Sequence, residues 1–328
     1  MTYKIVASNH PRLAIVIVTW NVRTLVLNGI GSVIDDLANG PFRGEIWVVD
    51  NKSSDGTAEA LRSAYPDECV PPVHVLEADE NLGFAAGNNH ALRAIGFPDS
   101  IDLPDYVLLL NPDTVVRPGA LSALIEGLET SNAGLAGARL VYSDGTFQHS
   151  AFGFPGLMQL IIDLFPVPAR LYESSLNGRY PHSMYEGSQP FEVDHPLGAT
   201  YLLRQDVICQ TGMFDEQFLL YCEEIDWAMR IKEAGWRVVC VPSAEVIHYG
   251  GQSTSQVRPE SVVNLWKARL QLYRKHYSSL KETLAKLIIR SGMNRLIQRT
   301  ARDSAQPEET RQALINAYIK VISLTREF

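Results

Sequence analysis

Short apolar runs alternate with amphipathic stretches over the first 145 residues. The apolar, β-branched runs occupy residues 12–21, 44–51, 73–80 and 106–113. Helical patterns follow them at residues 24–38, 55–65, 84–96 and 118–129. Strands that are apolar throughout and alternate with helices predict an α/β fold, in which a mostly parallel sheet is covered by helices on both faces.

The pattern changes after residue 145. Residues 146–193 are rich in Phe, Pro, Gly, Tyr and Ser and lack a clear period, which predicts long loops with one helix near 156–165. Long irregular inserts in compact domains are usually functional or mobile. Residues 195–212 predict one strand and a short helix, and residues 235–251 predict a final hairpin or strand pair.

From about residue 259 the pattern is helical to the C-terminus, and breaks are expected at Gly292 and at the polar stretch 303–307. We therefore predict a main domain over 1–258, with halves at 12–145 and 146–258, and a C-terminal helical region over 259–328.

Composition narrows the class of protein. The chain has 328 residues, of which 46% are hydrophobic and 20% charged, and it contains no apolar run long enough to span a membrane. It shows no signal-peptide pattern, and its four cysteines have no paired spacing, so we expect a reduced, cytoplasmic protein without a zinc cluster. A net charge of -8 argues against nucleic acid as a partner.

Polar residues follow the ends of all four predicted strands of the first half. Each is a common turn or cap residue by itself. Ligands in such sheets bind beyond the carboxyl ends of the strands, so four polar ends at one edge favour a binding site over caps alone. The residues are Thr19, Trp20 and Asn21; Asp50 and Asn51; Asn81 and Gly83; and Asn111, Pro112 and Asp113.

Two of these acids suggest specific chemistry. Asp50 could accept the imide N–H of a uracil or thymine ring, and nearby serines are better placed to cap the next helix. Asp113 could hold a divalent cation together with diphosphate oxygens, which needs few protein ligands. Opening a turn before the next helix explains Asp113 about as well.

A further acidic cluster begins the predicted helix at 223–236. Glu223, Glu224 and Asp226 lie in its first turn, where the helix dipole favours acids. Apolar residues lie just before this cluster, so the alternative is that one of the acids is a general base with a raised pKa. Another of the acids could then form a salt bridge to Arg230. His248 closes a strand, and a lone histidine is more often structural than a ligand.

Six motifs follow one another along the chain: "VIVTWN", "IWVVDNKSSDGT", "ENLGFAAGNNHAL", "YVLLLNPDTVV", "PLGATYLLRQDVICQTGMFDEQFLLYCEEIDWAMR" and "VPSAEVIHYGGQS". In this order they resemble inverting family-2 glycosyltransferases of the GT-A fold. The nearest subgroup is the rhamnosyltransferase-like enzymes of bacterial polysaccharide and cell-wall assembly. The resemblance covers residues 12 to about 255.

The resemblance implies a role for each matching residue. Glu224 matches the catalytic base, Asp113 the acid that binds Mg²⁺ or Mn²⁺, and His248 a histidine that completes the metal site. The chain departs from the family pattern at two places, because Asn111 replaces the first acid of the metal motif and Glu224 replaces the usual Asp. The nucleotide-binding positions are Thr19, Trp20, Asn21, Asp50, Asn81, Gly83, Asn88 and Asn111.

The implied reaction is a single displacement from a nucleotide-diphosphate sugar, with dTDP-rhamnose the leading donor, to a glycan or polyprenyl-linked acceptor. A nucleotidyltransferase is one alternative, although the first strand lacks the Gly-rich basic loop of those enzymes. A catalytically inactive nucleotide-sugar-binding protein is another, because of the two departures from pattern.

The charge distribution is uneven. Residues 267–302 hold ten Lys/Arg and one acid, so this segment carries +9 and the remainder -17. Within 281–302 the apolar residues fall near helical spacing with basic residues between them. Such a helix can lie on an anionic membrane surface, or it can pack on the globule or on a second copy in a homodimer.

Overall fold

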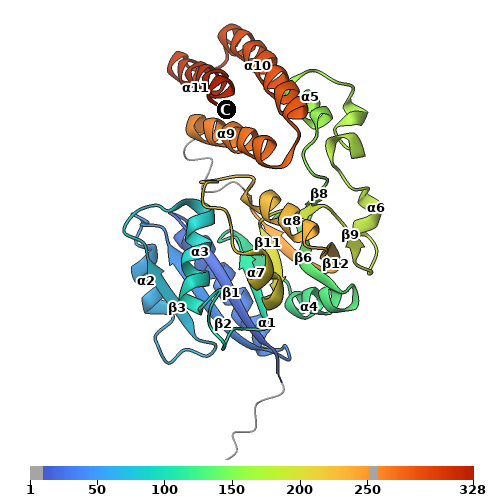
Figure 1. The fold of residues 1–328 in the computed structure, drawn as a ribbon. Helices are drawn as coiled ribbons and strands as arrows, with labels where there is room; N and C mark the ends of the chain where they lie inside the picture. The colour runs from blue at the N-terminus through green and yellow to red at the C-terminus, as the bar shows by residue number, and fades with distance from the viewer. Residues whose placement is uncertain (1–9, 251–257) are drawn as a thin grey trace, which may run out of the picture.

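The structure, a computed structural model, describes residues 10–250 and 258–328. A lobe built on one large sheet carries a helical lobe made by the C-terminal part of the chain (Figure 1).

The first half of the chain alternates strands and helices as its hydrophobic pattern predicts, which confirms the four strands and four helices expected there. The elements are β1 (Arg12–Thr19), α1 (Arg23–Ala38), β2 (Arg43–Asp50), α2 (Thr57–Ala64), β3 (Val73–Glu77), α3 (Gly83–Ile95), β4 (Tyr106–Leu110), β5 (Thr114–Val116) and α4 (Ala120–Thr130).

The remaining elements of this lobe run from residue 133 to residue 248. They are β6 (Ala133–Val141), β7 (Phe147–Gln148), β8 (Ala151–Phe152), α5 (Leu157–Leu164), two 3₁₀ turns η1 (Ala169–Leu171) and η2 (Ser175–Asn177), α6 (His182–Tyr185), β9 (Phe191–Glu192), β10 (His195–Pro196), β11 (Thr200–Arg204), α7 (Gln205–Thr211), α8 (Glu223–Glu233) and β12 (Arg237–His248). The helix expected near 156–165 is α5, and the helix that begins at residue 223 is α8.

The hairpin or strand pair expected within 235–251 is wrong. Residues Arg237–His248 form one continuous strand, β12, whose pairing with β6 shifts register between Val241 and Glu245. This irregularity accommodates Pro242, which cannot donate a ladder hydrogen bond, without reversing the chain.

Ten strands of the described residues share one sheet, with the path β3-β2-β1-β4-β11-β6-β12-β5. The four strands β3, β2, β1 and β4 are parallel to one another, and β11 is antiparallel to both of its neighbours. One face of the sheet packs on α1 and α4, and the other packs on α3, α7 and α8. The prediction of a mostly parallel sheet covered on both faces is therefore confirmed.

The C-terminal helices α9 (Arg258–His276), α10 (Ser279–Arg302) and α11 (Glu308–Glu327) form a separate apolar cluster with α5. The break expected at 303–307 lies between α10 and α11, but the break expected at Gly292 is wrong because α10 continues through it. A Cβ at Gly292 would lie 2.7 Å from Cβ of Leu164, so glycine is needed here for close packing against α5 and not to end the helix.

Candidate active site

The polar strand ends of the first half meet at one edge of the sheet. Thr19 at the end of β1 is in register with Asp50 at the end of β2. On the other side of β1, Ile17 pairs with Leu110, the last residue of β4, and Asn111 follows directly. The edge lies at the carboxyl ends of parallel strands, where α/β sheets bind ligands.

Three buried oxygen atoms at this edge have no hydrogen-bond partner among the described residues. They are Oγ1 of Thr19, Oδ1 of Asp50 and Oδ1 of Asn51, on side chains exposed by 3% or less. The second carboxylate oxygen of Asp50 accepts a hydrogen bond from the Ser53 amide at 3.0 Å, which fixes the orientation of the carboxylate. Buried acceptors are normally satisfied, so these three atoms are suited to bind the donor groups of a ligand.

Several predicted nucleotide-binding residues use their side chains within the surrounding loops. Asn21 accepts a hydrogen bond from the Ser54 amide at 2.8 Å, and Asn81 accepts one from the Gly83 amide at 2.9 Å. The buried side chain of Asn88 donates to the carbonyl four residues earlier in α3. Trp20 is half-buried beside Asn21. These residues shape the loops around the edge of the sheet.

The start of α3 lies against the loop that leads into α8. Gly83 has φ of 77°, and a Cβ on it would collide with the carbonyl oxygen of Leu219. The Phe84 amide donates to that same carbonyl at 3.2 Å. A side chain at position 83 would therefore push the two loops apart, which explains why glycine occupies it.

The predicted metal-binding residues Asp113 and His248 are in contact. Oδ1 of Asp113 lies 3.5 Å from Nε2 of His248, and both side chains are less than 10% exposed. The side-chain nitrogen Nδ2 of Asn111 lies 3.4 Å from the same Nε2 atom. The turn is held because the Thr114 hydroxyl donates to the Asn111 carbonyl at 2.7 Å and the Tyr249 amide donates to the Asp113 carbonyl at 3.0 Å.

Carboxylate oxygen suits both Mg²⁺ and Mn²⁺, and imidazole nitrogen suits a transition-metal ion such as Mn²⁺ better than Mg²⁺, so this pair fits Mn²⁺ best. No cluster of three or more His, Cys, Asp or Glu side chains that could hold a metal occurs within residues 10–250 and 258–328. Two protein ligands leave most coordination positions for other groups, such as the diphosphate of a bound nucleotide.

Gln148, on β7, contacts the other ring nitrogen of His248. Its amide oxygen lies 3.2 Å from Nδ1 of His248 and accepts a hydrogen bond from the N–H group at that position. Nε2 then presents a lone pair toward Asp113. A hydrogen bond of this kind orients histidine ligands in metal sites, and Gln148 had no signal in the sequence.

Glu224 lies close to the same turn. A Cβ on Gly198 would contact Cβ of Glu224 at 3.5 Å, and the next residue, Ala199, accepts a hydrogen bond from the Asn111 amide at 3.0 Å. The hydroxyl of Tyr201 donates to the backbone carbonyl of Glu224 at 3.0 Å. Burial raises the pKa of Glu224 to about 7, so near neutral pH this carboxyl group exchanges protons readily.

Glu223 and Asp226 have different surroundings. Glu223 is 4% exposed, its Oε2 has no partner among the described residues, and burial together with the charge of Glu224 raises its pKa well above the usual range. Asp226 is fully buried and pairs with Arg230 at 2.9 Å, which confirms the predicted salt bridge.

Gln148 is the residue that the structure adds to those expected from the sequence, whereas Asn51 was expected there only as a polar strand end without a role of its own. Asn51 directly follows Asp50, and its amide donates to the Gly83 carbonyl at 2.9 Å, so adjacency to a predicted site residue was the available signal.

Comparisons with known proteins identify the family of the chain. The profile of Glycosyl transferase family 2 matches residues 14–185, which is slightly more than half of the chain. An N-acetylglucosaminyl-diphospho-decaprenol L-rhamnosyltransferase of Mycobacterium tuberculosis is 30% identical over 220 residues, covering 64% of this chain and 68% of that protein. Rhamnosyltransferase WbbL of Escherichia coli is 27% identical over 169 residues, covering 51% of this chain and 61% of that protein.

Solved structures have the same fold. A crystal structure of GalNAc-T7 with UDP, GalNAc and Mn²⁺ superimposes with a TM-score of 0.60 at 14% identity, covering 97% of this chain but only 56% of that one. The mannosyltransferase PcManGT of Pyrobaculum calidifontis, in complex with GDP-Man and Mn²⁺, gives 0.54 at 14% identity, covering 98% and 87%. The family profile and these likenesses favour a glycosyltransferase over a nucleotidyltransferase. The chain belongs to glycosyl transferase family 2 and is a glycosyltransferase of the GT-A fold.

Proposed function

We propose that this glycosyltransferase transfers L-rhamnose from dTDP-rhamnose, with inversion, to a hydroxyl group of a glycan or polyprenyl-linked acceptor. The observation that carries the reaction type is the partly buried carboxyl group of Glu224, which has a pKa of about 7 and lies next to the turn that holds Asp113 and His248. The choice of rhamnose and of a lipid-linked acceptor is supported by the names of the relatives.

The nucleotide would bind at the ends of β1 and β2. A thymine or uracil ring presents one imide N–H, and Oδ1 of Asp50 is a buried acceptor without a partner among the described residues. Oδ1 of Asn51 and Oγ1 of Thr19 are available for the remaining polar groups. Leaving such acceptors unpaired is costly, so a ligand that supplies donors gains affinity at this edge.

Asp113 and His248 would hold Mg²⁺ or Mn²⁺ together with oxygen atoms of the donor diphosphate. When bound, the cation would offset the negative charge that grows on the leaving diphosphate. The support for this part is the oxygen and nitrogen donor set and its anchoring by Gln148. With Asn111 in place of an acid, the site has one carboxylate and therefore depends on the donor for cation affinity.

Glu224 would act as the general base. Its carboxylate takes the proton of the acceptor hydroxyl while the acceptor oxygen bonds to the anomeric carbon. The bond from that carbon to the diphosphate oxygen breaks on the opposite face, and the nucleoside diphosphate leaves with the electron pair. Glu223 stays protonated because its pKa is raised well above the usual range, so the neighbouring pair carries a single negative charge.

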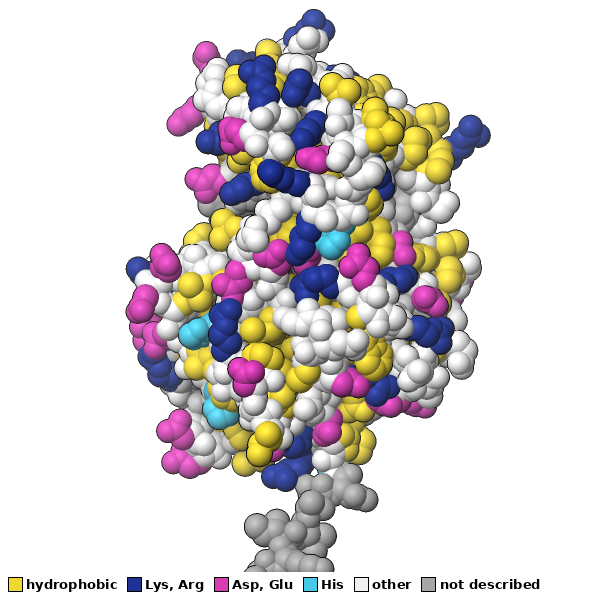
Figure 2. All heavy atoms as spheres, in the orientation of Figure 1, with side chains coloured by type: hydrophobic (Ala, Val, Ile, Leu, Met, Phe, Trp, Pro, Cys, Tyr) yellow, Lys and Arg dark blue, Asp and Glu magenta, His cyan; other side chains and the backbone are white. Residues whose placement is uncertain are grey.

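The acceptor side of the site would be formed by the insert at 146–193, and the helical lobe would bring it to a membrane. None of the described helices is both long enough and apolar enough to cross a bilayer. Lys and Arg side chains gather over the upper lobe, which α9–α11 form (Figure 2). A cationic surface of this kind favours peripheral binding to anionic lipids.

A thermal-shift screen tests the donor. Nucleotide sugars that differ in base and sugar are compared with and without Mn²⁺, and a ligand at 100 times its dissociation constant adds about 2.7 kcal/mol of stability. We expect dTDP-rhamnose with Mn²⁺ to give the largest shift, and Asp113→Asn to remove its Mn²⁺ dependence. A larger shift with a purine nucleotide sugar would contradict the proposal.

Slow release of dTDP from the donor without acceptor would separate an active enzyme from an inactive nucleotide-sugar-binding protein. An inactive protein would show the thermal shift and no release.

A further inference from the structure

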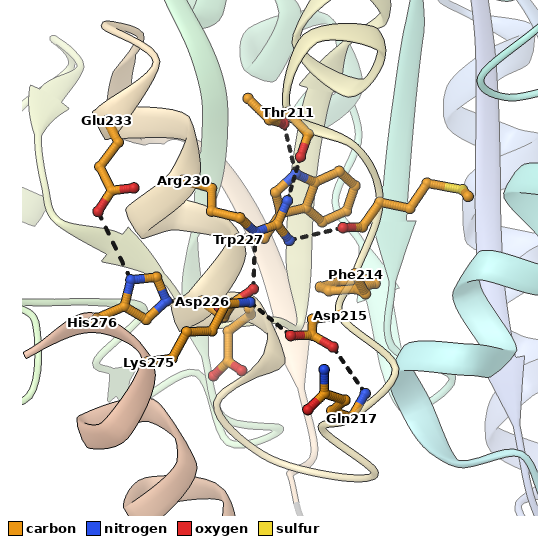
Figure 3. A network of polar contacts seen from close by, with 12 residues as sticks. Thr211, Phe214, Asp215, Gln217, Asp226, Trp227, Arg230, Glu233, Lys275 and His276 are labelled. Atoms are coloured by element: carbon orange, nitrogen blue, oxygen red, sulfur yellow. Dashed lines mark hydrogen bonds and ion pairs between the residues drawn. The ribbon is translucent and has the colours of Figure 1, made fainter.

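The C-terminal end of α9 contacts α8, the helix that begins with Glu223 and Glu224. Asp226 lies on the inner side of α8 and is fully buried. Nζ of Lys275 and Nε2 of His276 each lie 2.7 Å from Oδ1 of this carboxylate (Figure 3). The helical lobe therefore supplies two of the groups that bind an acid two residues after the proposed base.

The other oxygen of Asp226 is bound from α8 itself. Nε of Arg230 lies 2.9 Å from Oδ2, and the same guanidinium donates to the carbonyls of Thr211 and Met213. The indole N–H of Trp227 donates to the Thr211 hydroxyl at 2.9 Å. These bonds attach α8 to the end of α7 and to the start of the loop over residues 212–222.

This loop is held from two further sides. Lys275 contacts Asp215 at 2.7 Å as well as Asp226, so one lysine of α9 joins the loop to α8 (Figure 3). From the nucleotide half, Asn89 exchanges hydrogen bonds with the backbone of Phe214 at 2.9 and 3.1 Å, and it also donates to Glu216 at 2.9 Å.

The loop ends in an unfavourable backbone conformation. Tyr221 and Cys222, the last residues before Glu223, have φ values of 73° and 66°. Residues other than glycine adopt such angles rarely, and the conformation persists only where the surroundings fix it. The contacts of Lys275 and His276 with Asp226 are part of those surroundings.

We propose that Lys275 and His276 are positioning residues for the transfer reaction, because by binding Asp226 they hold α8 and the loop before it so that Glu224 faces the reaction site. The proposal rests on the assignment of Glu224 as the base. In this proposal the helical lobe contributes to catalysis by positioning Glu224.

The charges around α8 support this role. Burial acts to raise the pKa of Asp226, but hydrogen bonds from His276 and Lys275 and the charge of Arg230 lower it to about 2, so the carboxylate stays ionised. Asp215, Tyr201 and Glu233, which lies 3.8 Å from Nδ1 of His276, also face this part of α8, and Cys222 and Glu223 lie at its start. Without the cation of Lys275, less of the negative charge of Asp226 is offset, and the pKa of Glu224 should rise.

The test uses the full chain with Lys275→Met and, separately, His276→Gln. We expect faster amide hydrogen exchange in peptides covering 212–224, and a fall of about 10- to 100-fold in the turnover of donor hydrolysis with little change in donor KM. The acid limb of the pH profile should move to higher pH in Lys275→Met. Lys275→Arg should restore most of the turnover because it keeps the charge.

Lys320→Met is the matched control, since this lysine is exposed on α11 and is not a partner of Asp226. If Lys275→Met does not fold, we use the double variant Asp226→Asn/Lys275→Met, which removes both charges together. We expect the same faster exchange at 212–224 and the same fall in turnover for it. Unchanged exchange at 212–224, or faster exchange with wild-type turnover and pH profile, would overturn the proposal. Wild-type protein that hydrolyses no donor would instead refute the proposed function, and the exchange data would still decide whether α9 anchors the loop.

Discussion

Glu223 and Glu224 are adjacent in the sequence but differ in their suitability as a base. The pKa of Glu224 is about 7, whereas that of Glu223 is raised well above its usual range by burial and by the charge of its neighbour. A base near the working pH is the more effective one, and it contributes typically 10²–10⁴-fold. We predict that Glu224→Gln lowers turnover by about this factor and leaves the dissociation constant of the donor nearly unchanged, as measured by calorimetry. Wild-type turnover in Glu224→Gln combined with a loss in Glu223→Gln would reverse the assignment.

The pH dependence follows from the same pKa. Glu224 accepts a proton only when ionised, so kcat/KM of the wild-type enzyme should rise with pH and level off above about 7. Because the pKa of Glu224 is raised in the folded protein, the folded state holds this proton more tightly than the unfolded chain does. The contribution of this proton to the free energy of unfolding is lost as the pH rises to about 7. Glu224→Gln is uncharged throughout, and its thermal midpoint at pH 8 should equal or exceed that of the wild type. A lower midpoint would mean that unfolding contributes to the loss of activity.

Gln148 gives a prediction for cation binding. Because Gln148 accepts a hydrogen bond from Nδ1–H of His248, replacing Gln148 with leucine removes the group that keeps Nε2 free for a cation. Changes to such supporting hydrogen bonds typically cost 10–100-fold in metal affinity. We expect Gln148→Leu to weaken Mn²⁺ binding by about this factor in a spectroscopic titration with dTDP present. Gln148→Glu keeps an acceptor and should bind Mn²⁺ nearly as well as the wild type, and equal affinity in Gln148→Leu would contradict the role.

Single elements differ in how clearly the sequence predicted them. The first four strands and the four helices of the first half have strong periodicity because each packs on the sheet or belongs to it, and these were predicted, whereas β5 and β6 were not. β12 was not, because a proline within an apolar run is also typical of a turn, and only its pairing with β6 shows that the strand continues. The contacts of Gln148 with His248 and of Lys275 with Asp226 join residues that are 100 and 49 positions apart, and no local pattern reports them.

Gly292 provides a test at the scale of a helix. By helix propensity alone, alanine in the middle of α10 should stabilise the protein by about 1 kcal/mol. The structure predicts the opposite sign, because a Cβ here would lie 2.7 to 2.9 Å from three atoms of Leu164. We expect Gly292→Ala to lower the thermal midpoint, whereas Ser291→Ala, on the exposed side of the same helix, should leave it equal or raise it. A higher midpoint for Gly292→Ala would show that α5 and α10 do not approach so closely.

At the scale of the whole molecule, the helical lobe packs on the globule and also keeps an exposed apolar stripe. α10 turns Ala285, Ile289 and Met293 inward, all fully buried against α5, α9 and α11. Packing and membrane binding were alternatives in the sequence; the structure shows packing on the inner face of α10, and membrane binding by the outer face stays a prediction. Removing everything after residue 278 would also destroy the inner packing, so truncation alone cannot test the outer face.

The outer face of α10 carries Leu280, Leu284 and Leu287, whose exposed fractions are 71%, 40% and 54%. Their spacing places them on one side of the helix, and the surrounding segment 267–302 carries +9. Leucines flanked by cations favour an anionic lipid surface, because the leucines enter the interface while the cations meet the head groups. We predict that the protein sediments with phosphatidylserine or phosphatidylglycerol vesicles and that Leu284→Gln/Leu287→Gln weakens this binding by about tenfold or more.

The same experiment distinguishes binding to anionic lipid from nonspecific hydrophobic adsorption. Ile319→Gln removes a comparably exposed apolar residue, 53% exposed, from α11 and should leave vesicle binding unchanged. Raising the salt concentration should weaken binding of the wild type, because attraction between the basic segment and the head groups is screened. Neutral vesicles should bind the wild type less than anionic ones for the same reason. If the double leucine variant binds anionic vesicles as tightly as the wild type, the stripe on α10 has no part in membrane attachment.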